Sequence, residues 1–405
     1  MDMTAPNKKG TVRDFPFVDQ IDKLELEPIL AELRREEPIS RVRLPYGGEA
    51  WLLTRYHDVR AALADPRLSR AATVHADVPR RHEMLVGPEG IMYMDPPNHT
   101  RLRKLIGKAF TKRRVEALRP RVEVIAGELA DELAAKPAPG DVAASFSWPL
   151  PTRVICELLG VPYADRAIFR EGADAMMLAD TLPHEEFANR AGKLIAYIRD
   201  LIAQRRAKPT EDMLTALVHA RDNEDRLDEN ELVSISLVLL TGGHETTATQ
   251  ITNSIYTLLR HPDQLARLRA DRGMIRGAVD ELLRFMGTGS GHHEALIAME
   301  PVEIGGHVFE KGEAIFVHVN SANYDEEVFE NPETLDIGRK ASSHMSFGHG
   351  IHYCLGAQLA TMELNVALET LLDRFPRLAL AGDDDAIRWR ASLLTRGPET
   401  LPVTW

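Results

Sequence analysis

The sequence contains very little cysteine: Cys156 and Cys354 are the only two in 405 residues. Two cysteines so far apart make a disulfide framework implausible and are typical of a protein that works in a reducing compartment. Cys156 lies within the apolar, helix-like residues 154–159, so we interpret it as a core residue. Cys354 is therefore the candidate for a chemical role.

Long apolar runs and linkers are also missing. Residues 1–20 mix Asp, Lys, Thr and Pro and hold no stretch suited to a signal peptide or membrane anchor, so we expect a cytoplasmic protein. The chain shows no long Gly/Ser-rich or Pro-rich linker and no internal repeat. We predict one domain over residues 1–405, with 44% hydrophobic residues to form its core.

Positive charge is in deficit. The chain has 49 Lys and Arg against 61 Asp and Glu, and its formal net charge of −12 argues against general nucleic-acid binding. One segment departs from this balance, because Arg101 to Arg114 includes seven basic residues and no acid. A local positive face of this kind is suited to receive an acidic protein partner.

The periodicity predicts a mainly α protein with small β-sheets. Residues 39–54 show a hairpin pattern around Pro-Tyr-Gly-Gly, and most of residues 95–285 alternates apolar and charged positions at helical spacing. Strand-like segments return within residues 302–319, and a last helix is predicted over about 357–375.

One predicted helix is unusually long. Asp228 and Glu231 form a capping-box pattern and Pro262 supplies a stop, so the span between them would extend about 50 Å at 1.5 Å per residue. Its middle, residues 241–247, reads Thr-Gly-Gly-His-Glu-Thr-Thr. Each helical glycine costs about 1 kcal/mol relative to alanine, and a buried carboxylate is also costly.

Such concentrated cost indicates a function for this segment. The glycines would let a flat cofactor and dioxygen approach the helix, and a groove or kink would open beside them. Glu245 and Thr246 could transfer protons there. The alternative is a structural helix in which threonine hydroxyls bond to backbone carbonyls and the glycines only ease packing.

Cys354 lies in a loop that is built for close approach. Residues 346–360 read Ser-Phe-Gly-His-Gly-Ile-His-Tyr-Cys-Leu-Gly-Ala-Gln-Leu-Ala, in which three glycines precede or follow the cysteine and an apolar helical run begins directly after it. A lone thiolate can ligate haem iron and favour cleavage of the O–O bond. The alternative is a buried structural cysteine in a glycine-rich turn.

The pattern Phe-x-x-Gly-x-His-x-Cys-x-Gly resembles the haem-ligand loop of the cytochrome P450 monooxygenases. The segment Gly-Gly-x-acid-Thr, the sequence Asp-Pro-Pro at 95–97 and the pair Glu281/Arg284 follow in the order of that family. The resemblance covers nearly the whole chain. It implies the P450 fold, with haem b between the long central helix and the helix after the cysteine loop.

The resemblance also implies roles for individual residues. Glu245 and Thr246 would be catalytic, and Cys354 would ligate the iron. His99 and Arg103 stand four residues apart on one helical face, so both could reach one anionic group, and the resemblance identifies that group as a haem propionate with His352 as a further partner. The implied cofactor-binding residues are His99, Arg103, Gly242, Phe347, His352, Cys354 and Gly356.

Two further groups follow from the same resemblance. Glu281 and Arg284, an i,i+3 pair that by itself would contribute only about 0.2 to 0.5 kcal/mol, would join Arg339 in a buried structural network. The predicted substrate pocket comprises Met176, Met177, Val238, Leu239, Gly242, His292, His293, Leu393 and Leu394, although the methionines fit a core equally well.

The chain departs from the family pattern at two positions. Leu296 stands where an arginine usually binds a propionate, so one propionate is expected to be held differently, and His292 or His293 could substitute. Tyr324 replaces the arginine of the family's Asn-Arg-Asp segment, which affects a local structural contact.

The resemblance therefore implies a monooxygenase that uses O2 and electrons from a separate ferredoxin and ferredoxin reductase to oxidise a small organic molecule. The strings Gly-His-Glu-Thr-Thr and Gly-His-Gly-Ile-His resemble those of actinobacterial members, which favours secondary metabolism, such as antibiotic biosynthesis. Two alternatives stay open: a peroxide-driven haem-thiolate peroxygenase and a non-enzymatic haem-thiolate sensor.

Overall fold

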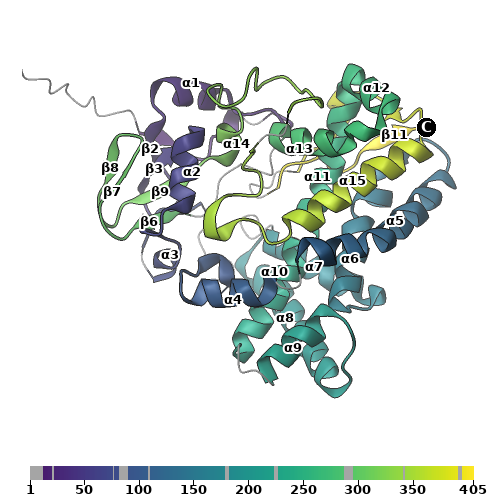
Figure 1. Ribbon diagram of the computed structural model, residues 1–405, viewed down its shortest axis with the longest axis horizontal. Helices are drawn as coiled ribbons and strands as arrows, with labels where there is room; N and C mark the ends of the chain where they lie inside the picture. The colour runs from purple at the N-terminus through teal and green to yellow at the C-terminus, as the bar shows by residue number, and fades with distance from the viewer. Residues whose placement is uncertain are drawn as a thin grey trace, which may run out of the picture.

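The computed structural model describes residues 12–20, 22–75, 77–81, 90–107, 110–177, 182–222, 227–286, 295–340, 343–390 and 395–405. Within these ranges the protein is mainly α-helical with small β-sheets, which confirms the predicted fold class (Figure 1). None of the helices described there is both long and apolar enough to cross a membrane.

The largest sheet has the strand order β1-β2-β3-β9-β6-β4. The predicted hairpin forms its second and third strands. In it β2 (Ile39–Arg43) pairs antiparallel with β3 (Glu49–Leu53), and Gly47 and Gly48 adopt positive φ angles of 75° and 93° in the turn. The other strands are β1 (Arg13–Asp14), β9 (Ala314–Val317), β6 (Leu296–Ala298) and β4 (Leu68–Ser69).

Short helices cover this sheet on the left of Figure 1. They are α1 (Pro28–Glu36), α2 (Tyr56–Ala64), α3 (Ala72–His75) and α14 (Val319–Ala322). The predicted strands at 302–309 form a separate hairpin of β7 (Val302–Ile304) and β8 (His307–Phe309), while β10 (Ala379–Leu380), β11 (Pro402–Thr404) and β5 (Gly140–Asp141) form a third small sheet.

Two hydrophobic clusters organise the helical body. The first joins α5 (Lys112–Ala134), α6 (Pro149–Leu159), α11 (Glu245–Arg260), α12 (Pro262–Ala270), α13 (Ile275–Met286) and α15 (Ala357–Arg374). In Figure 1, α5 and α15 lie side by side, and α15 confirms the predicted last helix. Burial of leucine, isoleucine and valine side chains between these helices is the main source of their stability.

The second cluster lies between α4 (Asn98–Gly107), α6, α7 (Arg166–Met177), α8 (His184–Ala207), α9 (Met213–Asp222) and α10 (Glu229–Gly242). Cys156 on α6 belongs to it and is 1% exposed, which confirms the prediction of a core cysteine. Burial raises the pKa of this thiol to about 12, so it stays protonated at neutral pH.

The prediction of one long helix from Asp228 to Pro262 is wrong. The capping box of Asp228 and Glu231 does start a helix, but α10 ends at Gly242 and α11 begins at Glu245. The Thr246 hydroxyl donates to the Gly242 carbonyl over 2.8 Å, so a side chain occupies an acceptor of the helical ladder next to two poor helix formers.

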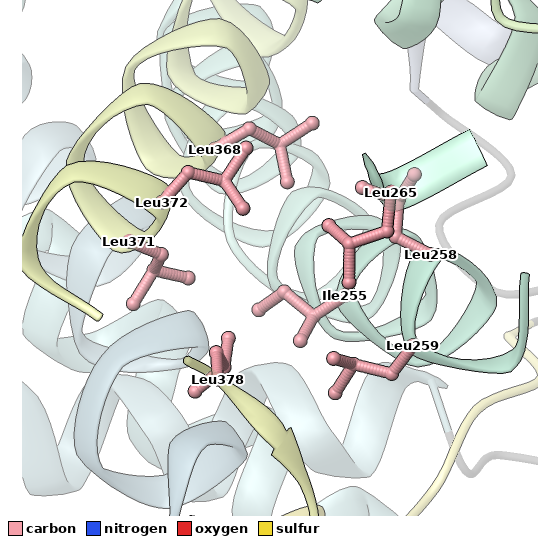
Figure 2. Close-up of a pocket in the computed structure, with 8 residues that line it drawn as sticks. All are labelled: Ile255, Leu258, Leu259, Leu265, Leu368, Leu371, Leu372 and Leu378. Atoms are coloured by element: carbon pink, nitrogen blue, oxygen red, sulfur yellow. The ribbon is translucent and has the colours of Figure 1, made fainter. Parts of the chain in front are cut away.

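A small apolar cavity lies within the first cluster, among α11, α12, α15 and the residue before β10 (Figure 2). Its lining is Ile255, Leu258, Leu259, Leu265, Leu368, Leu371, Leu372 and Leu378. These side chains offer no polar or titratable group, so we assign this cavity to imperfect core packing.

Candidate active site

The Cys354 loop is shaped by glycines that other residues could not replace. Gly348 and Gly350 have φ angles of 73° and 71°, in the left-handed region that favours glycine. A Cβ atom at Gly350 would lie 2.2 Å from the carbonyl oxygen of Leu63, so the loop fits directly against the end of α2. Cys354 then donates its backbone N–H to the Phe347 carbonyl over 2.8 Å.

The environment of the Cys354 thiol has opposing effects on its charge. The residue keeps an exposed surface, yet protein surrounds its thiol closely enough that burial raises its pKa. The backbone N–H groups of Gly356 and Ala357, at the start of α15, and the charge of Arg103 act in the opposite direction. These donors favour the thiolate, which is the form that binds a metal.

Helix α4 brings His99 and Arg103 to this loop. Arg103 donates a hydrogen bond to the Tyr353 carbonyl, next to the cysteine. The rings of His99 and His352 lie 4.3 Å apart between centroids. The structure thus brings together the three side chains that the sequence predicts at one anionic group.

His99 is suited to such an anion. It is 2% exposed, and among the described residues none forms a hydrogen bond with its Nε2 atom. Burial lowers the pKa of His99, and the nearby charges of Arg103 and Arg70 lower it further. A buried ring nitrogen near two guanidinium charges is suited to bind a carboxylate. The propionate groups of the predicted haem are carboxylates.

The α10–α11 junction presents an open surface beside a hydroxyl. Gly242 is exposed, and a Cβ atom built there would meet no atom within 4 Å. Val238 lies one turn earlier on the same helical face and is half-buried, as is Thr246. This face is therefore open at the position where the sequence predicts the approach of a flat group.

Glu245 faces a different set of partners. It is 2% exposed, and its Oε1 atom accepts hydrogen bonds from the Thr395 hydroxyl over 2.8 Å and from Arg390 over 3.3 Å. The Arg390 guanidinium lies 4.0 Å above the Trp148 ring. Sequence reasoning missed Arg390 and Thr395, because residues about 150 positions away carry no local signal of a shared contact.

The predicted substrate pocket is described only in part. Leu239 is 7% exposed and packs in the second hydrophobic cluster, about 100° around α10 from Val238, and its place in the pocket stays a prediction. Met176 and Met177 end α7, but their side chains lie outside the described residues, as do His292, His293, Leu393 and Leu394.

The structure brings Glu281, Arg284 and Arg339 together in one buried network. Arg284 donates two hydrogen bonds of 2.8 Å to the two carboxylate oxygens of Glu281, and its side chain is 0% exposed. Arg339 donates to Glu281 over 3.0 Å. Arg284 also reaches the backbone carbonyls of Asn323 and Pro332, each over 2.9 Å.

This network continues to the start of the cysteine loop through Asn323. Its side chain accepts from the backbone N–H of Met345 over 2.7 Å and donates to the Ser346 hydroxyl over 2.9 Å. Tyr324, at the second departure from the family pattern, donates its hydroxyl to the Phe285 carbonyl over 2.6 Å, and the Arg284 guanidinium lies 5.5 Å from its ring. Tyr324 therefore makes the local structural contacts at this position, with Phe285 and Arg284.

The family model described as Cytochrome P450 matches residues 174–400. Nocardicin C N-oxygenase of Nocardia uniformis subsp. tsuyamanensis is 46% identical over 394 residues, which cover 97% of this chain and 98% of that protein. Mycinamicin IV hydroxylase/epoxidase of Micromonospora griseorubida is 45% identical over 394 residues, with the same coverage.

A solved structure shows the same likeness in three dimensions. The LnmA cytochrome P450 hydroxylase from the leinamycin biosynthetic pathway of Streptomyces atroolivaceus superimposes with a TM-score of 0.91 at 46% identity. The match covers 97% of this chain and 100% of that one.

Proposed function

Because this chain belongs to the cytochrome P450 family, we propose that residues 1–405 form one P450 catalytic domain whose iron ligand is Cys354. The chain is a haem-dependent monooxygenase with the P450 fold, as predicted. The position of Cys354, directly before α15 in a glycine-shaped loop, is the observation that carries the assignment.

We assign the other cofactor contacts to the residues around this loop. His99, Arg103 and His352 would hold a propionate, and the surfaces at Gly242, Phe347 and Gly356 would let the ring approach the backbone. A Cβ atom at Gly356, as at Gly242, would meet no atom within 4 Å. When bound, the haem supplies an iron that activates dioxygen, and its thiolate ligand favours O–O cleavage.

Proton delivery is assigned to the Oγ1 atom of Thr246. This hydroxyl now donates to the Gly242 carbonyl. Because a hydroxyl both donates and accepts, rotation of the Thr246 side chain about χ1 would let it leave this carbonyl and donate to an acceptor on the open side of the junction. Glu245 is assigned to accept a proton and to pass it on to Thr246, and Arg390 and Thr395 hold its Oε1 on the buried side. Val238 and Gly242 give the neighbouring open surface an apolar lining.

Replacement of Thr246 tests this assignment. We expect Thr246→Ala to bind haem and substrate normally but to yield about tenfold less product per NADPH consumed, because reducing equivalents go to peroxide and water. Product and NADPH are measured with supplied ferredoxin and reductase. Thr252→Ala is the matched control, since Thr252 donates to the Ala248 carbonyl over 2.9 Å in the same helix.

The outcomes separate the candidate functions. Equal coupling in the Thr246 variant and its parent would contradict proton delivery by this hydroxyl. Turnover with peroxide but none with ferredoxin and reductase would favour the peroxygenase alternative. Haem binding without turnover of any kind would favour the sensor.

The substrate is proposed to be a secondary metabolite. The relatives named above act, by name, on nocardicin C and mycinamicin IV, and another relative, 42% identical over 98% of this chain, is the P450 monooxygenase PikC of Streptomyces venezuelae. A screen of candidate metabolites for a ligand-induced change of haem spin state would identify the compounds that enter the pocket.

We propose that a ferredoxin docks on the face formed by the cysteine loop and the basic segment. Ile351 and Tyr353 on the loop are 47% and 40% exposed. Helix α4 contacts this loop through Arg103, and the exposed basic residues of α4 and of the start of α5 are Lys104, Lys112, Arg113 and Arg114. Arg101 is an exception, because it pairs with Glu231. An apolar centre with a basic rim suits an acidic electron donor.

Charge reversal tests this docking face. We expect Lys104→Glu/Lys112→Glu/Arg113→Glu to slow ferredoxin-supported turnover and to flatten its salt dependence, because screening acts over about 8 to 10 Å at physiological salt. Peroxide-supported activity and substrate affinity should stay unchanged. Lys311→Glu, in the exposed turn after β8, is the control. An equal loss in both assays would show damage to the haem site and would overturn the docking proposal. Lys108 also belongs to the basic segment but lies outside the described residues, so it is left unchanged in this test.

A further inference from the structure

Arg70 directly follows strand β4 and is buried. Strand β4 pairs antiparallel with β6 in the register Leu68↔Ala298 and Ser69↔Ile297. Arg70 lies in the bend directly after the last of these pairs, and Leu296 is the next residue of β6 beyond the same pair. The family pattern leads us to expect an arginine at 296. Arg70 is 3% exposed and Leu296 is 4% exposed. Because both residues adjoin one strand pair, a charge at 70 lies near the position that a charge at 296 would occupy.

The backbone at Arg70 is held toward helix α4. Its N–H donates to Oδ1 of Asp95 over 3.1 Å, and the Ser69 hydroxyl donates to Oδ2 of the same carboxylate over 2.5 Å. The Arg70 carbonyl accepts from the Thr73 N–H over 3.1 Å and from its hydroxyl over 2.6 Å. Asp95 stands just before α4, so Arg70 is tied to the helix that carries His99.

The charge of Arg70 reaches the proposed propionate site. Its positive charge contributes to the lowered pKa of His99, after burial and Arg103. His99, Arg103 and Arg70 therefore form a local concentration of positive and donor groups in a chain of net charge −12. Haem carries two carboxylates, and a carboxylate is an anion that such a group of cations and donors can bind.

We propose that Arg70 binds a carboxylate of the haem and takes the role of the arginine that is absent at position 296. The inference rests on the proposed function, because it requires haem in the site beside Cys354. A guanidinium group suits this role, since its planar fork can donate two parallel hydrogen bonds to one carboxylate. In this chain the cation would therefore come from the end of β4, whereas the family pattern has it on β6.

Three variants test the proposal on the holoenzyme. We expect Arg70→Leu to release haem about tenfold faster to an excess of apomyoglobin, and to lower the midpoint potential because a carboxylate loses its counter-charge. Arg70→Lys, which keeps the charge but loses the fork, should lie between this variant and the parent. The double variant Arg70→Leu/Leu296→Arg returns the cation to β6 and should restore both values toward those of the parent.

The control is Arg67→Leu, which removes an exposed arginine that pairs only with Asp65 at 2.6 Å among the ion pairs described. The proposal would be overturned if Arg70→Leu released haem at the same rate as the parent and had the same midpoint potential. A loss that Arg70→Lys and the double variant both fail to recover would show a folding defect and would overturn it as well. The ferrous carbonyl spectrum of the parent tests the proposed function separately, because it depends on Cys354 and not on Arg70.

Discussion

Replacement of Cys354 by serine is expected to abolish the red-shifted absorption band of the ferrous carbonyl complex. The band would require a thiolate ligand to the haem iron, and an alcohol cannot supply one. The expected change is complete, because the other cysteine, Cys156, is buried in the second cluster and its pKa is raised to about 12.

Cys156→Ser is the matched control for this experiment. It removes a thiol of the same chemistry from α6 and should leave the band in place, with a modest loss of stability from a polar group in the core. Absorption of the Cys354→Ser complex that is identical to the parent's would show that another residue ligates the iron.

Removal of Arg284 should have the second-largest effect. Arg284→Leu leaves Glu281, whose side chain is 1% exposed, with Arg339 as its remaining cationic partner. Breaking a buried pair in this way typically costs about 3 to 5 kcal/mol of unfolding free energy, and here it also releases the carbonyls of Asn323 and Pro332. Urea unfolding of the holoenzyme, followed by circular dichroism, measures the loss.

The control for this variant is Arg267→Leu. Arg267 pairs with Asp336 at 2.9 Å, but both side chains are nearly half exposed, so the expected loss is about 0 to 1 kcal/mol. If Arg284→Leu lost no more than this control, the network would not be the support of the cysteine loop that its hydrogen bonds to Asn323 indicate.

Local patterns predicted much of the fold. The hairpin at 39–54, the capping box at Asp228 and the last helix at 357–374 each depend on neighbours in the chain, and each forms as predicted. The glycines predicted a groove or kink in the long helix, and the structure has a complete break there, between Gly242 and Glu245. The Thr246 hydroxyl bonds to the Gly242 carbonyl, as the structural alternative for these threonines predicts, but propensity does not reveal which threonine lies beside the break.

Parts of the site depend on contacts that sequence spacing cannot show. The motif identified Glu245, but its partner Arg390 lies on the C-terminal segment, and only the fold brings the two together. Val238 and Leu239 are equally apolar in the sequence. Their orientation on α10, set by packing against α8 and α9, decides that Leu239 is core while Val238 stays half-buried.

The junction at Gly243 and His244 also separates the helix that packs in the second hydrophobic cluster from the helix that packs in the first. Buried apolar residues of α10, from Leu232 to Leu240, belong to the second cluster, whereas those of α11, from Ala248 to Leu258, belong to the first. Substitutions on the buried face of α10 are therefore expected to repack its contacts with α8 and α9, whereas those on the buried face of α11 are expected to repack its contacts with α13 and α15.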